Sequence, residues 1–246
     1  MRWFRNMDNG VFVTGTDTEI GKTVITAGLI SALQDEGYDI GGMKPFQSGS
    51  YIENGELLAH DVEFILRHTN INDDYDLLNP VRLGPALAPS VAADIEDKEI
   101  SVCEVELAYQ ELQQRHQGLV VEGAGGLMVP LAENFLIPDL IKLLDLPVII
   151  VARPNLGTIN HSVLTVKTAR NLGLDVLGVV INNYPQQEAG IVEESNPALI
   201  SKLADVPILG VVPHLPQLEN EANNVDLGIV IKEHLDLEKV IEVMSI

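Results

Sequence analysis

The segment that most restricts the fold is a glycine-bounded loop between a short apolar run and an amphipathic stretch. Residues 11–14 are followed by Gly15-Thr16-Asp17-Thr18-Glu19-Ile20-Gly21-Lys22-Thr23, and residues 22–36 have helical apolar spacing. This context predicts a phosphate-binding loop, in which backbone N–H groups, a lysine and a hydroxyl bind nucleotide phosphates and Mg²⁺. Five residues rather than the usual four separate Gly15 from Gly21, so Thr16 stands where the strict motif has its first glycine. The alternative is an ordinary strand-to-helix turn with an exposed lysine.

Short apolar runs alternate with helical stretches along the whole chain. Strands are predicted at residues 10–14, 39–44, 118–122, 147–152, 175–181 and 208–212. Helices are predicted at residues 22–36, 61–68, 102–115, 159–172, 197–204 and 235–244, and loops at 79–89 and 183–194. The alternation predicts an α/β fold of the phosphate-loop NTPase type: one domain over residues 1–246, with a doubly wound, mostly parallel sheet flanked by helices. Ligands bind such sheets at the carboxyl ends of the strands.

Composition limits the partners of the chain. A net charge of −21 disfavours nucleic acid and anionic membranes as partners. The single cysteine, Cys103, favours a reducing compartment. Residues 1–10 lack the apolar core of a signal peptide, and the longest apolar stretch, residues 146–152, is too short to span a bilayer. We therefore expect a soluble, cytoplasmic protein.

Two carboxylates could serve a nucleotide site. Glu122 ends a predicted strand and precedes Gly123-Ala124-Gly125-Gly126, so its carboxylate could reach Mg²⁺ beside the phosphate loop. The alternative for Glu122 is a solvated strand end. Asp61 begins a predicted helix, where a first-turn acid is favoured by the helix dipole, and spacing alone supports that interpretation.

Two further segments could contact a substrate. Lys44 ends the second predicted strand, with Ser48 four residues on, and could face the γ-phosphate or simply extend from the sheet edge. Gly157 and Thr158 begin a predicted helix, whose free N–H groups could bind a carboxylate. The alternative there is a plain helix cap by Thr158.

Together these segments resemble the dethiobiotin synthetase family. The matching segments occur in family order and lie at residues 13–23, 44–45, 48–50, 121–126, 157–161 and 181–183. The long form of the phosphate loop is a family feature. The resemblance extends from residue 13 to about residue 213, which is most of the chain.

The resemblance implies specific roles. It makes Lys44, Lys22 and Ser48 catalytic, and it assigns Mg²⁺ to Thr23, Asp61 and Glu122, which replaces the first-turn interpretation of Asp61. The residues implied to bind ATP are Thr18, Glu19, Ile20, Gly21, Lys22, Thr23, Val24, Asn182 and Pro213. Those implied to bind substrate are Ser48, Gly157, Thr158, Ile159 and Asn160, the last four at the substrate carboxylate and across a homodimer interface.

The implied activity is that of an ATP-dependent ligase in biotin biosynthesis. CO₂ and 7,8-diaminononanoate (diaminopelargonic acid) form a carbamate, ATP converts it to a carbamic–phosphoric anhydride, and ring closure gives dethiobiotin, ADP and phosphate. Phosphoryl transfer of this kind depends on positioning and charge neutralisation, which two lysines and Mg²⁺ can supply.

Two other classes of protein share the phosphate loop. Partition and septum-site ATPases usually have a second lysine early in the loop, but residues 16–20 contain none. Their membrane-bound members end in a basic amphipathic helix, whereas residues 236–246 are rich in acids. A cobyrinate synthase domain would need a nucleophilic cysteine, and Cys103 lies outside any such motif.

Overall fold

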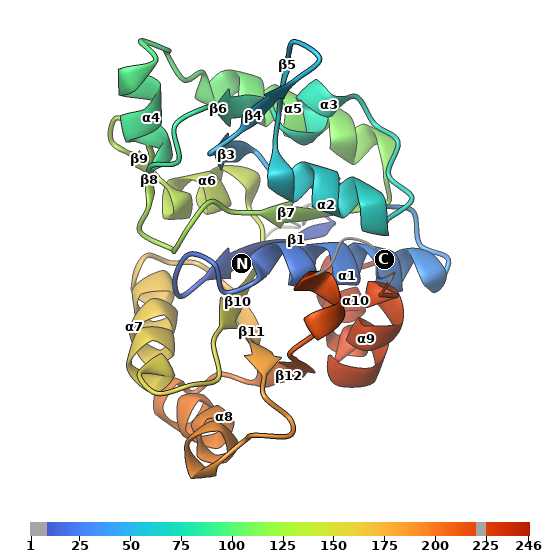
Figure 1. Cartoon of the computed structure of the whole chain (residues 1–246), viewed down its shortest axis with the longest axis vertical. Coiled ribbons are helices and arrows are strands. Elements are labelled where there is room, and N and C mark those ends of the chain that lie inside the picture. The colour runs from blue at the N-terminus through green and yellow to red at the C-terminus, as the bar shows by residue number, and fades with distance from the viewer. Residues whose placement is uncertain (1–8, 220–224) are drawn as a thin grey trace, which may run out of the picture.

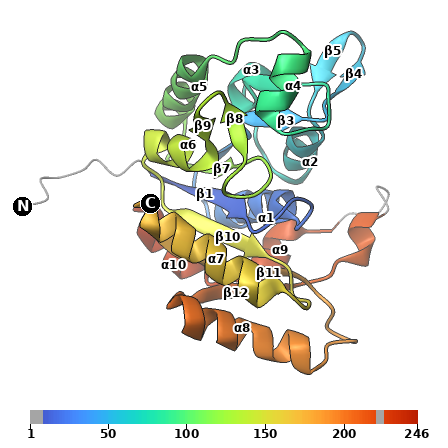
Figure 2. The ribbon, with the colours of Figure 1, turned by 90° about the vertical axis from the view of Figure 1, so that its left-hand side faces the viewer.

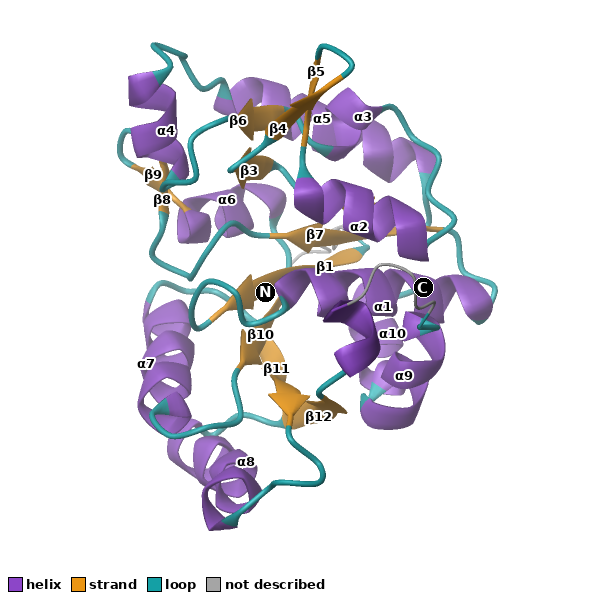
Figure 3. Ribbon diagram, in the orientation of Figure 1, coloured by secondary structure: helices purple, strands orange, loops and turns teal. Residues whose placement is uncertain are grey.

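The computed structural model describes residues 9–219 and 225–246, so the segment for which we predict no signal peptide lies mostly outside the described residues. A six-stranded sheet runs through the molecule in the order β12-β11-β10-β1-β7-β2, with every pairing parallel (Figure 3). Its strands are β1 (Gly10–Gly15), β2 (Ile40–Met43), β7 (Gly118–Glu122), β10 (Val148–Ala152), β11 (Val176–Tyr184) and β12 (Ile208–Pro213). The predicted fold class and all six predicted strands are confirmed.

Helices cover both faces of this sheet. Helices α7 and α8 lie on one side of the β10–β12 half, and α1 and α9 lie on the other (Figure 1). The helices are α1 (Lys22–Asp35), α2 (His60–His68), α3 (Tyr75–Leu78), α4 (Pro89–Ile95), α5 (Val102–Arg115), α6 (Ile137–Leu144), α7 (Thr158–Asn171), α8 (Ile191–Ala204), α9 (Leu227–His234) and α10 (Leu237–Met244). No helix in the described ranges combines the length and apolarity needed to cross a membrane.

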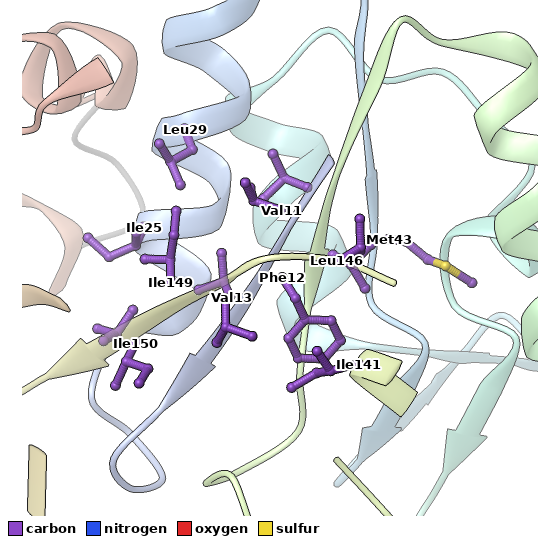
Figure 4. Packing of buried hydrophobic residues seen from close by; sticks show 14 of the residues in the cluster. Val11, Phe12, Val13, Ile25, Leu29, Met43, Ile141, Leu146, Ile149 and Ile150 are labelled. Carbon is purple, nitrogen blue, oxygen red and sulfur yellow. The ribbon is translucent and has the colours of Figure 1, made fainter. Parts of the chain in front are cut away.

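Strand β1 shows why the sheet is buried on both faces. Successive side chains of a strand point to opposite faces, and β1 is apolar at consecutive positions. Val11 and Val13 lie toward α1, whereas Phe12 lies toward α6 near Ile141 (Figure 4). All three β1 side chains are fully buried, and each contributes about 1.5–3 kcal/mol of transfer free energy. The central strand is therefore fixed by packing on both sides, which holds the loop that follows it.

Three two-stranded sheets lie beyond the β7–β2 end of the main sheet (Figure 2). They are β3 with β6 (Phe46–Ser48 and Val81–Leu83), β4 with β5 (Tyr51–Glu53 and Glu56–Leu58), and β8 with β9 (Pro130–Ala132 and Phe135–Leu136). Sequence patterns predicted none of these short pairs. Strand β3 follows β2 almost directly, so Lys44 lies between two strands with little freedom of its backbone.

Helix α8 begins six residues earlier than predicted. Pro197 favoured a helix start at residue 197, since proline suits the first turn, but the helix starts at Ile191 and contains Pro197 in its interior. The Glu193 carboxylate accepts the Gly190 backbone N–H at 3.1 Å, which caps the true start. The predicted loop at 183–194 therefore ends in helix, and the one at 79–89 contains β6. Helices α3, α4, α6 and α9 were also not predicted.

A charged cluster ties the far end of β2 to α5. His116 follows α5, and its ring nitrogens contact the carboxylates of Asp39 at 2.7 Å and Asp73 at 2.9 Å. Arg115 also contacts Asp73, at 3.1 Å. Burial opposes the charged imidazole, but the hydrogen bonds to Asp39 and Asp73 outweigh it and raise the pKa of His116 above 6.5. The cluster therefore favours a charged His116.

Candidate active site

The predicted phosphate loop connects β1 to α1 at the carboxyl end of the sheet. Gly21 precedes α1 with φ +83°, a left-handed conformation that favours glycine. A Cβ atom on Gly21 would lie 2.1 Å from Asn182 Nδ2, so the site also requires the absence of a side chain. Helix α1 has neither a side-chain cap nor an acidic residue in its first turn. Its first N–H groups therefore form a site for an anion.

Lys22 is the first residue of α1, and its side chain folds back over the loop. The ammonium donates to the Asp17 carbonyl at 3.2 Å, and the residue is 6% exposed. Burial, followed by repulsion from Lys44, lowers the pKa of Lys22 to about 8. An anion in the loop would favour the charged form of this lysine and give it a stronger partner than a carbonyl.

Asp61 from α2 and Thr23 from α1 converge on Lys44 and Glu122. Lys44 Nζ lies 2.6 Å from Asp61 Oδ2 and 2.7 Å from Glu122 Oε1, and it donates to the Gly123 carbonyl at 3.0 Å. The Thr23 hydroxyl donates to the same Glu122 oxygen at 2.9 Å. Lys44 and Glu122 are 3% and 1% exposed, so this is a buried charge cluster rather than a solvated sheet edge. The solvated interpretations of Lys44 and Glu122 are wrong.

Burial and charge compete within this cluster. Burial disfavours the ammonium of Lys44, but Glu122 and Asp61 outweigh it and raise the pKa of Lys44. At Asp61 the attraction of Lys44 outweighs burial and lowers the pKa. At Glu122 burial dominates, and with the nearby Asp61 it raises the pKa of the carboxyl despite Lys44. Glu122 thus gains from any further cation placed beside it.

The oxygen atoms here suit a hard divalent cation. Asp61 and Glu122 oxygens contact one nitrogen atom, so they lie close together, and Thr23 lies on the same side of Glu122. Glu122 Oε2 is buried without a hydrogen-bond partner. Among the described residues no group of three or more His, Cys, Asp or Glu side chains could hold a metal. Two carboxylates and one hydroxyl nevertheless fit Mg²⁺, which binds few protein ligands and keeps waters and phosphate oxygens.

A cleft of about 340 Å³ joins the phosphate loop to the charge cluster. Nine of the residues singled out from the sequence line it, namely Thr18, Glu19, Gly21, Lys22, Thr23, Lys44, Ser48, Asp61 and Glu122. Phe46, Gln47, Ala124 and Gly125 also line it, and sequence reasoning gave the first two no role. Phe46 and Gln47 follow Lys44 on β3, so their position next to a candidate lysine is the signal that could have found them.

Asn182 and Pro213, the residues expected at the purine, do not line this cleft. Asn182, near the end of β11, is 1% exposed and donates its amide N–H to the Ile20 carbonyl at 2.9 Å. The next residue, Asn183, is exposed with φ +58°. Pro213 ends β12 opposite Tyr184. Ile20 is buried and Val24 half-buried, so they contribute packing and backbone. Asn182 is thus a structural support of the loop.

The segment expected at the substrate carboxylate also lies outside the cleft. Gly157 (φ +93°) precedes α7, which has no side-chain cap and no acid in its first turn. Thr158 is buried, whereas Gly157 and Asn160 are exposed. Arg153, at the end of β10, places a guanidinium nitrogen 3.3 Å from where a Gly157 Cβ would be, and its buried Nε has no partner among the described residues. Sequence reasoning did not single out Arg153.

A parallel sheet with a glycine-bounded loop, a loop lysine and a carboxylate at the neighbouring strand tip defines a phosphate-loop nucleotide-binding protein. The family model described as "AAA domain" matches residues 9–222. An ATP-dependent dethiobiotin synthetase of Bacillus velezensis is 41% identical over 92% of this chain and 94% of its own length. One of Thermodesulfovibrio yellowstonii is 37% identical over 96% of this chain and 99% of its own. The chain belongs to the ATP-dependent dethiobiotin synthetase family. The predicted resemblance and the ligase class are confirmed.

Solved structures of other proteins share the fold. The MinC:MinD cell division complex of Aquifex aeolicus matches 96% of this chain and 94% of its own with a TM-score of 0.57 and 14% identity. A ParA family ATPase of Chlorobium tepidum matches 97% of this chain and 99% of its own with a TM-score of 0.54 and 16% identity. At such low identity these likenesses show the fold alone.

Proposed function

We propose that this chain converts 7,8-diaminononanoate, CO₂ and ATP to dethiobiotin, ADP and phosphate. The observation that carries the proposal is the single cleft that contains a phosphate loop, a second lysine and two carboxylates. The relatives are named ATP-dependent dethiobiotin synthetases over nearly their whole length. The proposal is supported by the origin of the cleft residues, since elements far apart in the sequence bring both lysines and both carboxylates to one cleft.

The proposed reaction has three steps. One amine of the substrate adds to CO₂ and loses a proton, which gives a carbamate. A carbamate oxygen attacks the γ-phosphorus, the bond to the ADP oxygen breaks, and a carbamic–phosphoric anhydride forms. The second amine then attacks the carbonyl carbon, phosphate leaves, and a C–N bond closes the cyclic urea. ADP is thus formed in the second step, whereas phosphate is released only when the second amine closes the ring.

The cleft residues divide this work by position. Lys22 and the first N–H groups of α1 bind the β- and γ-phosphates. Lys44 lies across the cleft and neutralises charge on the carbamate and the transferring phosphoryl group, and Ser48 donates a hydrogen bond to the carbamate. Thr23, Asp61 and Glu122 would hold Mg²⁺, which supplies charge neutralisation on the phosphate oxygens when bound. Asn182 and the backbone near Pro213 complete the ATP site on the purine side.

We also propose that the substrate carboxylate binds at the start of α7 in a second copy of the chain. Residues 157–160 lie outside the cleft, so a neighbouring copy could provide them. The guanidinium of Arg153 beside Gly157 supports an anion site there. Leu156 and Leu164 are 81% and 57% exposed, which supports a homodimer contact at α7. One domain over residues 1–246 and a cytoplasmic location remain part of the proposal.

The test is phosphate release from ATP with diaminononanoate and bicarbonate, each omitted in turn, with the product identified by mass spectrometry. Release should require both compounds, and the product should have the mass of the cyclic urea. Equal phosphate release without the diamine would contradict the proposal and indicate a switch ATPase. Light scattering of the purified protein tests the dimer separately.

A further inference from the structure

The Lys44 ammonium lies where a divalent cation would contact the two carboxylates. Its nitrogen atom is 2.6 Å from Asp61 Oδ2 and 2.7 Å from Glu122 Oε1, and the whole side chain is buried. The oxygen of Glu122 that contacts Lys44 is also the one that accepts the Thr23 hydroxyl. The Lys44 ammonium thus already contacts two of the three proposed metal ligands, and the third, Thr23, binds the same Glu122 oxygen.

Lys44 and a metal ion cannot share this position. Mg²⁺ contacts its oxygen ligands at about 2.0–2.1 Å, so an ion bound to both Asp61 Oδ2 and Glu122 Oε1 would overlap the space that the ammonium fills. The two cations would also repel each other strongly at such a separation. Metal entry through these two oxygen atoms therefore requires the Lys44 side chain to leave both of them.

The backbone of Lys44 is fixed, so only its side chain can move. The Lys44 N–H donates to the Leu78 carbonyl at 2.8 Å, and the Asn79 amide donates to the Lys44 carbonyl. A buried ammonium leaves two carboxylates only for a comparable anionic partner, since an unpaired buried charge is costly. In this cleft such a partner would be the phosphate chain of a nucleotide bound as proposed, since residues of the phosphate loop and Lys44 line the same cleft.

We infer that Lys44 acts as a stand-in cation that closes the metal site until a nucleotide binds. Phosphate oxygens then take over Lys44, and the carboxylates become free for the metal. Metal and nucleotide binding are thereby coupled, and the nucleotide-free protein excludes divalent ions in spite of its acidity. The inference rests on the proposed assignment of Asp61 and Glu122 as metal ligands.

The test uses Mn²⁺ as a spectroscopic probe in place of Mg²⁺. Free Mn²⁺ is titrated by electron paramagnetic resonance against the full chain, with and without a non-hydrolysable ATP analogue, at one pH and ionic strength. The wild-type protein should show a site only with the analogue. Lys44→Met keeps the length and apolar bulk of the side chain without its charge. It should bind Mn²⁺ without nucleotide at least about tenfold more tightly than wild type, since a close like charge has been removed.

Lys22→Met is the matched control. It removes one positive charge from the same cleft, but Lys22 contacts the Asp17 carbonyl and neither carboxylate. Because Lys22 acts on Glu122 and Asp61 only through space, Lys22→Met should raise nucleotide-free Mn²⁺ affinity by clearly less than Lys44→Met does. An equal gain in Mn²⁺ affinity in both variants would mean that the loss of any positive charge from the cleft is sufficient, and it would overturn the inference.

The wild-type titrations keep the inference testable even where Lys44→Met fails to fold. Tight Mn²⁺ binding to nucleotide-free wild type, equal to that of the analogue complex, would overturn it. So would a folded Lys44→Met protein that shows no gain. No turnover occurs in these titrations, so their outcome is independent of the phosphate-release assay that tests the proposed function.

Discussion

Replacement of Gly21 by alanine tests the geometry of the phosphate loop with one methyl group. Gly21 has φ +83°, and an L-residue with a Cβ in this region costs about 1–2 kcal/mol. The new Cβ would lie 2.1 Å from Asn182 Nδ2, so Asn182 must move away and give up its bond to the Ile20 carbonyl. Loss of that bond costs about 0.5–1.5 kcal/mol. We expect Gly21→Ala to lower the free energy of unfolding by about 2–3 kcal/mol.

Urea denaturation followed by circular dichroism measures this change, and Gly37→Ala is the matched control. Gly37 follows α1 with φ +91°, but no atom would lie within 4 Å of an added Cβ. Only the backbone cost applies there, about 1–2 kcal/mol. In an Asn182→Ala background the cost of Gly21→Ala should fall toward the Gly37 value, because the obstructing amide is gone. Equal losses for Gly21→Ala and Gly37→Ala in the wild-type background would refute the reasoning.

Three further predictions concern charge. Lys44→Gln should lower kcat and kcat/KM for ATP by similar factors with little loss of nucleotide affinity. Lys22→Gln should in addition weaken the binding of an ATP analogue, measured by calorimetry. Loss of analogue binding in Lys44→Gln alone would contradict these separate roles of the two lysines. Glu122→Gln should raise the Mg²⁺ concentration needed for half-maximal phosphate release, while its circular dichroism spectrum stays unchanged. An unaltered Mg²⁺ requirement would argue against Glu122 as a metal ligand. His116 has a raised pKa, so its contribution to stability is fully present below its unfolded pKa of 6.5 and is lost as pH rises through the higher folded value. The difference in unfolding free energy between wild type and His116→Gln should therefore be larger at about pH 5.5 than at about pH 9, and a difference independent of pH would exclude this linkage.

The main sheet could be predicted because its strands are buried on both faces and read as continuous apolar runs. The three small strand pairs could not, since each strand has two or three residues and a periodic pattern needs more. The prediction of α8 was too short for a different reason. Proline is usual in a first turn, and nothing local shows that Pro197 is tolerated inside a helix that Glu193 has already capped.

The candidate site was predictable as a set of residues but not as a set of contacts. Asp61 alone resembles a first-turn acid, and it is the fold that sets its carboxylate against Lys44 from another strand. Lys44 is a buried partner rather than a surface lysine only because the fold returns Glu122, 78 positions further along the chain, to its side. Local spacing contains no information about that return.

The pairing of two lysines with two carboxylates has a kinetic consequence. The charges of Lys22 and Lys44 are cancelled by those of Asp61 and Glu122, and Glu19 also lines the cleft, so the cleft itself does not attract a distant ATP molecule. The remainder of the protein has a charge of −21, which repels an incoming polyphosphate from every direction. Added salt screens that repulsion beyond about 10 Å at 0.1 M. Capture of ATP should therefore become faster as ionic strength rises, the reverse of the trend for enzymes that attract nucleotides with a basic surface.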